Sequence, residues 1–309
     1  MRFIGKDEIA RALTFPRLIA ALEEAHRRPK IEIRDTMLGT PAQCYYVRSA
    51  VDRGRTFASK LITSFPANLA GGALPAVQAV VVLFDARDGR PLAVLDGTEI
   101  TAWRTAADSA LGAKYLARDD SHTLLVVGAG AMASWLVRAH RCARPSIARV
   151  LCWNRSEARA AQLAEALSAE AVAAEAVPDL EAAVRVADIV TSCTRAHSPL
   201  LRGDWLKPGT HLDLVGGYDL DTREADDACV RVARVYVDRR ETAKDVADIA
   251  RPLEEGVLRE GDILGDLYDL CAGRPPPRRS PADITFFKNA GGAHLDLMTA
   301  ELVFSVLNQ

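Results

Sequence analysis

The sequence predicts an α/β protein with a doubly wound parallel sheet in one domain and an antiparallel sheet in another. Three observations predict this class. From residue 122 onward, short apolar runs alternate with segments of helix length, as in parallel sheets covered by helices. One of these runs leads directly into a glycine-rich turn, which is typical of nucleotide-binding sheets. The first third mixes helix and strand patterns, and 309 residues are more than one ordinary core needs, so two domains are expected.

The charge balance excludes a polyanion as the main partner. Lys and Arg number 39 against 41 Asp and Glu, a net charge of −2, so neither nucleic acid nor an anionic membrane is expected to be bound. Apolar residues make up 49% of the chain, which is typical of a folded globular protein. We therefore expect a small-molecule ligand.

Targeting and metal-binding signals are also lacking in the sequence. Residues 1–10 are charged without an apolar stretch, and no apolar run reaches 18 residues, so we expect neither a signal peptide nor a membrane span and assign the chain to the cytoplasm. The six cysteines lie far apart without a C-x-x-C pair. We expect free thiols, no disulfides and no metal site.

The elements of the first domain follow from local patterns. Thr14 is predicted to cap a helix that Phe15 and Pro16 open and that continues through Leu22. β-rich segments then alternate with turns and end in a long alanine-rich helix. The predicted strands are Arg55–Thr63, Val77–Phe84 and Pro91–Leu95, and the helix is Thr98–Leu116.

The second domain shows the parallel-sheet pattern. Its strands are continuous apolar runs, as expected when both faces of a sheet are buried. They are Thr123–Val127, Val150–Trp153, Ile189–Ser192 and His211–Val215, with crossover helices at Ala131–Cys142 and Glu157–Leu167. After a proline-rich loop, residues 283–288 and the helical segment 290–307 are expected to return to the first domain.

A dinucleotide signature opens the second domain. In the segment Leu124–Ala133, a predicted strand is followed directly by the motif G-x-G-x-x-A, which opens a predicted helix. Gly128 permits the tight turn, and Gly130 lets the backbone approach a pyrophosphate, which the helix N-terminus at Ala131 and Met132 would hold. We assign these residues to a nicotinamide cofactor site, with Thr194 and Val215 as further contacts.

The second strand of this domain bears on cofactor choice. NAD enzymes place an acidic residue at its end, whereas this chain has Asn154, Arg155 and Ser156. A guanidinium can pair with the 2′-phosphate of NADP, so NADP is predicted in preference to NAD, with NAD remaining possible. The alternative is that Arg155 simply faces solvent at the start of a helix.

Three further segments carry a family resemblance. They are Lys60–Asn68, Leu95–Ala107, which contains T-x-x-R-T-A-A, and Phe287–Gly291. With the nucleotide motif between them, the chain resembles the ornithine cyclodeaminase/mu-crystallin family. The resemblance implies a Rossmann-type domain, residues 116–286, inserted in a split α+β substrate-binding and dimerisation domain, residues 1–115 plus 287–309. It also implies a homodimer.

The resemblance also implies roles for single residues. Lys60 and Arg104 would bind a substrate carboxylate, for which a guanidinium fork is well suited. A further arginine precedes the lysine in the family, and Arg34 fits its spacing better than Arg48 does. Thr105 would contact the cofactor phosphate, and Ala290 and Gly291 would line the substrate pocket.

One departure from the cyclodeaminase pattern decides the predicted reaction. Cyclodeaminases carry an Asp directly after the Gly-Gly pair that follows a strand, where this chain has Tyr218 after Gly216 and Gly217. Asp219 is one residue on, and such a shift redirects the side chain. The chain is therefore similar to the imine-reducing branch, the Δ1-pyrroline-2-carboxylate and ketimine reductases. We expect NAD(P)H-dependent reduction of a cyclic imino acid to proline or pipecolate.

Several alternatives remain open from the sequence. The rival activities are ornithine cyclodeamination, an alanine or opine dehydrogenase, and cofactor binding without turnover. The proton could come from Lys60, from Tyr218 or from water. We expect the histidines His26, His197 and His294, which belong to no motif, to be structural.

Overall fold

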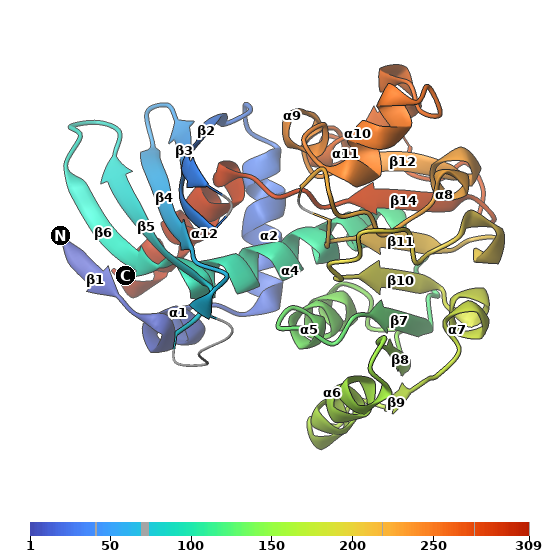
Figure 1. Cartoon of the computed structure of the whole chain (residues 1–309). Helices are drawn as coiled ribbons and strands as arrows, with labels where there is room; N and C mark the ends of the chain where they lie inside the picture. The colour runs from blue at the N-terminus through green and yellow to red at the C-terminus, as the bar shows by residue number, and fades with distance from the viewer. Residues whose placement is uncertain (41, 69–73, 218, 275, 309) are drawn as a thin grey trace. The chain divides into compact units, whose positions relative to one another are not determined.

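The chain folds into two compact units. The computed structural model describes residues 1–40, 42–68, 74–217, 219–274 and 276–308 (Figure 1). Unit 1 comprises Met1–Thr105 with Gly292–Gln309, and unit 2 is the continuous segment Ala106–Gly291. The domain boundaries predicted after residues 115 and 286 both fall inside unit 2, because the end of helix α4 and the last strand pack within it.

Unit 1 contains a six-stranded sheet in the order β1-β6-β5-β4-β3-β2. Its strands are β1 (Arg2–Ile4), β2 (Glu32–Thr40), β3 (Gln43–Asp52), β4 (Thr56–Ser64), β5 (Val77–Asp85) and β6 (Pro91–Asp96). The strands β2 to β6 pair antiparallel, and β1 pairs parallel with β6. The three predicted strands are confirmed as β4, β5 and β6.

Four helices accompany this sheet. They are α1 (Lys6–Ala12), α2 (Phe15–His26), the first half of α4 (Gly97–Leu116) and α12 (Ala293–Leu307). The predicted cap of α2 is confirmed, because Thr14 Oγ1 accepts a hydrogen bond from the backbone N–H of Arg17 at 3.4 Å. Helix α12 packs against β3, β4, β5 and α2, so most of its length is buried.

The strands of unit 1 alternate between a buried and a half-buried face. In β4, Ala58 and Lys60 are buried while Phe57 and Leu61 are half-buried. Successive side chains of a strand point to opposite faces of the sheet. Lys60 therefore shares the buried face, the one that helix α12 packs against in β4.

Unit 2 contains an eight-stranded parallel sheet in the order β13-β12-β14-β11-β10-β7-β8-β9. Its strands are β7 (Thr123–Val127), β8 (Arg149–Trp153), β9 (Ala174–Ala176), β10 (Ile189–Ser192), β11 (His211–Leu214), β12 (Ala233–Val237), β13 (Ile263–Gly265) and β14 (Ile284–Lys288). The predicted fold class, a Rossmann-type sheet in an α/β protein, is confirmed. The placement of residues 283–288 in the first domain is wrong, because β14 pairs with β11 and β12.

Helices cover both faces of the parallel sheet. They are α5 (Ala133–Ala143), α6 (Glu157–Ala169), α7 (Leu180–Val186), α8 (Asp227–Val232), α9 (Arg240–Ala243), α10 (Ala247–Glu254) and α11 (Leu267–Cys271), with short 3₁₀ turns at Gly203–Trp205 and Glu260–Asp262. Within the described residues, no helix combines the length and the apolar character needed to cross a bilayer.

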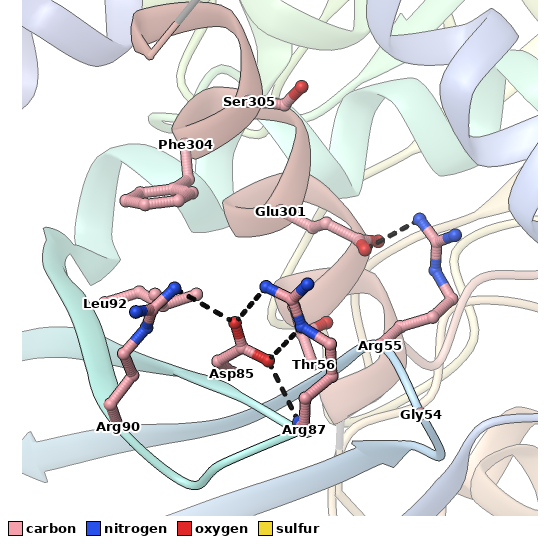
Figure 2. Close-up of a pocket in the computed structure, with 10 residues that line it drawn as sticks. All are labelled: Gly54, Arg55, Thr56, Asp85, Arg87, Arg90, Leu92, Glu301, Phe304 and Ser305. Atoms are coloured by element: carbon pink, nitrogen blue, oxygen red, sulfur yellow. Dashed lines mark hydrogen bonds and ion pairs between the residues drawn. The ribbon is translucent and has the colours of Figure 1, made fainter.

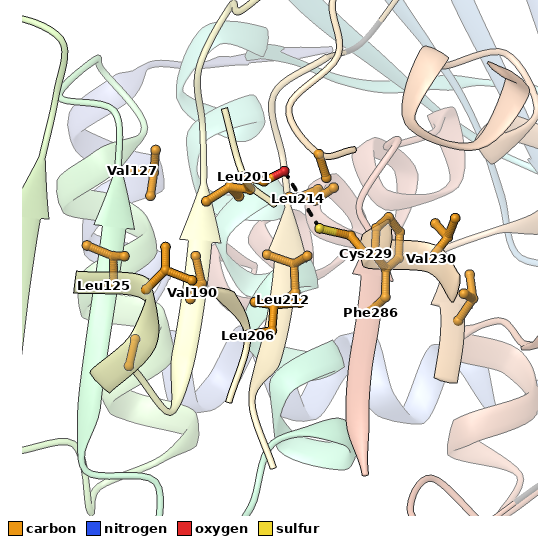
Figure 3. Packing of buried hydrophobic residues seen from close by; sticks show 14 of the residues in the cluster. Leu125, Val127, Val190, Leu201, Leu206, Leu212, Leu214, Cys229, Val230 and Phe286 are labelled. Atoms are coloured by element: carbon orange, nitrogen blue, oxygen red, sulfur yellow. Dashed lines mark hydrogen bonds between the residues drawn. The ribbon is translucent and has the colours of Figure 1, made fainter. Parts of the chain in front are cut away.

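Alternate residues of each strand enter two different cores. Leu125 and Val127 belong to one core with Val190, Leu212 and residues of α8 (Figure 3). Residues of α7 belong to the same core. Leu124 and Val126 instead pack with residues of α4, α5 and α6. A sheet buried on both faces in this way needs apolar residues throughout its strands, which explains why these strands could be recognised as continuous apolar runs.

Candidate active site

The carboxyl ends of four neighbouring strands bring the predicted cofactor residues to one edge of the unit 2 sheet. Gly128, Gly130, Ala131 and Met132 follow β7, Asn154, Arg155 and Ser156 follow β8, Thr194 follows β10, and Val215 follows β11. Strands β7 and β10 are neighbours, although β8 and β9 come between them in the sequence. The direction of winding reverses there, and ligands of doubly wound sheets bind at that switch point.

The two glycines after β7 meet different requirements. Gly128 has a φ of +105°, and a Cβ atom there would lie 3.1 Å from the Cys193 carbonyl oxygen. At Gly130 a Cβ atom would meet no atom within 4 Å. Gly128 is therefore required by the turn itself, whereas Gly130 leaves the backbone open to an approaching group. This cradle fits the pyrophosphate of a dinucleotide.

The residues after β8 hold the glycine loop and leave one cation available. Asn154 Oδ1 accepts a hydrogen bond from Ala129 N–H at 3.2 Å, and Asn154 Nδ2 donates to the Ser156 carbonyl at 3.1 Å. Arg155 is exposed and has no ion-pair partner in the described part of the chain. Its guanidinium is thus free to bind an anion beside the cradle.

A buried carboxyl group organises the loop after β10. Glu224 Oε1 accepts hydrogen bonds from Thr194 N–H at 2.7 Å, Thr194 Oγ1 at 2.8 Å and Ser192 Oγ at 2.5 Å. Burial raises the pKa of Glu224, Asp248 adds to the increase, and the Lys288 ammonium opposes it. Glu224 thereby fixes Thr194, one of the predicted cofactor residues.

A fully buried lysine holds the loop after β11. Lys288 Nζ donates hydrogen bonds to the Gly216 carbonyl and, at 3.1 Å, to Asp248 Oδ2. Asp248 Oδ1 accepts from the N–H groups of Glu224 at 2.9 Å and Ala225 at 3.2 Å. This network links the backbone beside Val215 to the segment that carries Glu224.

No sequence pattern predicted Lys288, Asp248 or Glu224 as site residues. Lysine and carboxylates are usually solvated, so nothing in their local pattern marks them as buried. The one available signal was the position of Lys288 inside the Phe287–Gly291 segment.

The predicted catalytic Tyr218 lies outside the described residues. Its neighbour Asp219 is occupied in a turn, because Asp219 Oδ1 accepts hydrogen bonds from the N–H groups of Asp221 at 3.0 Å and Thr222 at 2.8 Å, and from Thr222 Oγ1 at 2.6 Å. These three hydrogen bonds hold Asp219 Oδ1 within the turn.

In unit 1, Lys60 of β4 and Arg104 of α4 meet at a carboxylate that was not predicted. Asp296 Oδ1, on α12, lies 3.1 Å from Lys60 Nζ and 3.3 Å from Arg104 Nε. Lys60 Nζ also donates to Thr101 Oγ1. Lys60, Arg104 and Asp296 are 3%, 6% and 1% exposed. The two predicted carboxylate-binding residues therefore form one buried cluster.

Arg34, the predicted third basic residue, lies apart from this cluster. Arg48 pairs in register with Lys60, and directly opposite residues share a face. Arg34 pairs with Ser49, so it lies on the other face of the sheet and is exposed. Arg48 instead joins the cluster and donates through Nε to Asp35 Oδ2 at 2.9 Å. Only the strand register could decide between the two arginines.

Burial and neighbouring charges set the protonation of this cluster. Burial lowers the pKa of Lys60 to about 8; Asp296 opposes the decrease, while Arg104 and Arg48 add to it. Burial acts to raise the pKa of Asp296, but Lys60, Arg104 and Arg48 outweigh it and the pKa is lowered. Lys60 is therefore a cation that can lose its proton near neutral pH.

The remaining predicted contacts are distributed over both units. Thr105 is buried on α4 in unit 1, one residue after Arg104. Ala290 and Gly291 belong to unit 2, where Gly291 N–H donates to Asp238 Oδ2 at 2.6 Å. Their assignments to cofactor and substrate stay predictions.

A separate pocket of unit 1, with a volume of about 430 Å³, contains none of the predicted site residues among its described lining (Figure 2). It is lined by Gly54, Arg55, Thr56, Asp85, Arg87, Arg90, Leu92, Glu301, Phe304 and Ser305. Asp85 lies 2.7 Å from Arg87 and 3.5 Å from Arg90, and Glu301 lies 2.8 Å from Arg55. Its arginines are thus already paired with carboxylates.

The other candidate groups do not form a second site. The ring centroids of His26 and His294 lie 5.7 Å apart, edge to face. His197 is exposed, with Nδ1 3.1 Å from the Asp221 carbonyl. Within the described ranges, no group of three or more His, Cys, Asp or Glu side chains is arranged to hold a metal ion.

Comparison with known sequences gives matches over most or nearly all of the chain. The model of the ornithine cyclodeaminase/mu-crystallin family matches residues 46–309. A Δ1-pyrroline-2-carboxylate reductase of Paracoccus denitrificans (strain Pd 1222) is 43% identical over 307 residues, which cover 99% of this chain and 97% of that protein.

Comparison with solved structures gives the same fold. The Δ1-pyrroline-2-carboxylate reductase of Thermococcus litoralis, in complex with NADH and L-proline, superposes with a TM-score of 0.93 at 30% identity, covering 100% of this chain and 98% of that one. An archaeal alanine dehydrogenase dimer with bound NAD superposes with a TM-score of 0.92 at 26% identity, covering 99% of this chain and 95% of that one.

Proposed function

This chain belongs to the ornithine cyclodeaminase/mu-crystallin family, and on that premise we propose that it reduces a cyclic imino acid, Δ1-pyrroline-2-carboxylate or its six-membered homologue, to the corresponding amino acid. The enzyme is an oxidoreductase that uses a nicotinamide cofactor. The main support for this proposal is the 43% identity to a Δ1-pyrroline-2-carboxylate reductase along 99% of the chain. The buried Lys60 and Arg104 cluster supports it, because the substrate is a carboxylate.

Arg104 and Lys60 are proposed to bind the substrate carboxylate. In the described part of the chain the Arg104 guanidinium donates no hydrogen bond and is held only by an ion pair to Asp296. Its planar fork is therefore available for a bidentate contact. Lys60 is a second cation in the same buried group. A site of this kind fixes the ring by its carboxylate, and such positioning can contribute several kcal/mol, roughly 7 at the lower end of well-oriented cases.

Lys60 is also proposed to be the proton donor. When bound, the reduced nicotinamide supplies a hydride to the imine carbon. The electron pair of the C=N bond then moves to nitrogen, which takes a proton from Lys60 Nζ. A donor functions best with a pKa near the working pH, and a Lys60 pKa of about 8 meets this condition. Tyr218 and water are the alternative proton donors. A substitution of Lys60 would reveal whether one of them acts instead.

NADPH is proposed as the preferred cofactor. Two solved relatives carry NADH or NAD, so nicotinamide binding itself is common to these proteins. The preference rests on Arg155, which is exposed and unpaired within the described chain beside the Gly128 to Gly130 cradle. A 2′-phosphate would give this guanidinium a charge-assisted partner.

A homodimer in the cytoplasm is proposed as the working form. The half-buried face of the unit 1 sheet is largely apolar, with Phe57 opposite Phe84 and Leu61 opposite Val80. An uncovered apolar sheet face commonly marks an interface between subunits. All six cysteines are free, as is usual in a reducing compartment.

The decisive experiment measures both candidate reactions with one protein preparation. We expect oxidation of NADPH when Δ1-pyrroline-2-carboxylate is added, and no ammonia release from ornithine with NAD. Arg104→Ala should lower kcat/KM by at least roughly 100-fold, about 2.7 kcal/mol, since affinity and alignment are both lost. Arg104→Lys serves as the matched variant that keeps the charge without the fork. Ammonia release from ornithine, or tight NADPH binding without turnover of any imino acid, would refute the proposal.

A further inference from the structure

We propose that Asp296 is a positioning residue for the imine reduction: its buried carboxylate holds Lys60 beside Arg104 and keeps the Lys60 ammonium charged. The inference deepens the proposed function and rests on it. Asp296 belongs to none of the motifs found in the sequence, and its role follows from contacts within unit 1.

The geometry places one oxygen between two cations. Asp296 Oδ1 contacts Lys60 Nζ at 3.1 Å and Arg104 Nε at 3.3 Å, and the three residues come from α12, β4 and α4. Lysine and arginine side chains lose much rotamer freedom when they are fixed. A shared acceptor orders both before the substrate binds, while the hydrogen-bond donors of Arg104 remain unused among the described residues.

The charges around Asp296 leave room for one more anion. Lys60, Arg104 and Arg48 carry three positive charges, and Asp296 and Asp35 carry two negative ones. The excess of one positive charge in a buried site favours a monoanion such as a carboxylate. Asp296 thus lowers the charge of the empty cluster without neutralising it.

The charge state of Lys60 depends on Asp296 in particular. Lys60 is buried, and the guanidinium groups of Arg104 and Arg48 favour its neutral form. Asp35 is engaged by Arg48 Nε and Tyr46, and the nearby histidines, His294 of α12 and His26 of α2, are in ring contact with each other. Asp296 is therefore the carboxylate in direct contact with Lys60 in the described chain.

The second carboxylate oxygen of Asp296 also supports a functional role for this residue. Asp296 Oδ2 is buried and has no hydrogen-bond partner among the described residues. A buried carboxylate oxygen without a donor is costly, and a residue selected for stability alone would be expected to satisfy both oxygens.

The test compares how catalysis and ligand binding weaken at alkaline pH in three variants: Asp296→Asn, Asp296→Glu and the control Glu301→Gln. Glu301 lies on the same helix and pairs with Arg55, away from Lys60. Two quantities are measured from pH 6 to 9.5: kcat/KM for the cyclic imino acid, and Kd for cyclopentanecarboxylate, which has a carboxylate and no nitrogen to reduce. In the unmodified enzyme kcat/KM should fall and Kd should rise as the pH increases, each with a midpoint near the Lys60 pKa of about 8.

We expect Asp296→Asn to move both midpoints down by at least one pH unit, because the uncompensated lysine loses its proton earlier. Asp296→Glu should keep them within half a unit of the unmodified enzyme, and Glu301→Gln should not move them. A lower Tm in Asp296→Asn with unmoved midpoints would overturn the proposal, since it would leave Asp296 a structural role only. If Asp296→Asn does not fold, a full-unit shift in folded Asp296→Glu would overturn it as well.

Failure of the proposed function would give a different result. An enzyme that turns over no imino acid would still bind cyclopentanecarboxylate through Lys60 and Arg104, and the pH dependence of that Kd would still report on Asp296. Absence of turnover therefore counts against the reductase, and an unmoved Kd midpoint counts against the role of Asp296.

Discussion

Arg155 connects a single side chain to the choice of cofactor. It follows β8 and is exposed and unpaired in the described chain, beside the glycine cradle. Arg155→Ala should raise KM for NADPH by roughly 10-fold or more and change KM for NADH little, because a charge-assisted contact contributes about 1.5–3 kcal/mol. Initial rates with each cofactor at saturating imino acid measure both values. Equal losses with NADPH and NADH would refute the assignment.

Gly130 allows binding and stability to be separated. A methyl group there would meet nothing in the folded chain, so Gly130→Ala should keep the Tm of the cofactor-free protein within about 1 °C. The same methyl would occupy the approach path of the pyrophosphate, and Kd for NADPH should rise at least 10-fold. Calorimetry and cofactor titration provide the two readings. Gly128→Ala is the contrasting variant, since its φ of +105° predicts loss of stability.

At this scale the sequence identified charged residues only when they lay inside motifs. Lys60 and Arg104 could be assigned because their segments resemble a family. Arg48 could not be preferred to Arg34, because the decision depends on which face each strand position occupies, and register is a property of the pairing. Asp296 was missed because its contacts with Lys60 join residues far apart in the sequence.

At the scale of elements, helix α4 packs closely on strand β14. A Cβ atom on Gly112 would lie 2.8–2.9 Å from ring atoms of the buried Phe287. Gly112→Ala should therefore lower stability by about 1–2 kcal/mol despite the better helix propensity of alanine, since overpacking costs about 1–3 kcal/mol. Thermal unfolding of the variant should show a Tm lower by a few degrees.

Gly261→Ala is the matched control, because a methyl group at Gly261 would meet nothing within 4 Å. Its Tm should stay close to that of the unmodified protein. A Gly112→Ala variant as stable as this control would mean that the Phe287 ring moves aside at little cost.

Helices and strands could be predicted from the sequence where one pattern, such as a continuous apolar run, was clear. The apolar runs of β7, β8, β10 and β11 marked a sheet buried on both faces. Strands β2 and β3 were missed because nearly all of their residues are exposed or half-buried. The segment of β14 was placed in the first domain, whereas it pairs with β11 and β12 in unit 2, because strand propensity does not specify the partner.

At the scale of the whole molecule, the half-buried sheet face of unit 1 predicts a dimer. Val82 of β5 lies on that face, opposite Ser59 of β4 and Val94 of β6. Light scattering should give twice the 33.4 kDa of one chain, and Val82→Lys should shift the mass toward one chain because a charge would be buried in the interface. Val232→Lys, at an exposed valine of unit 2, should leave the mass unchanged. A single-chain mass at all concentrations would exclude the dimer.

The split of unit 1 between the two ends of the sequence has a consequence for biosynthesis. Unit 2 is continuous from Ala106 to Gly291, so a ribosome delivers all of it before α12 emerges. Domains tend to fold as their residues become available, but the sheet of unit 1 must wait for α12 to cover it. Asp296 arrives on that helix. A nascent chain can therefore complete unit 2 while the cluster of Lys60 and Arg104 still lacks its central carboxylate. Premature termination would release a polypeptide with an exposed sheet, a target for chaperones and proteases.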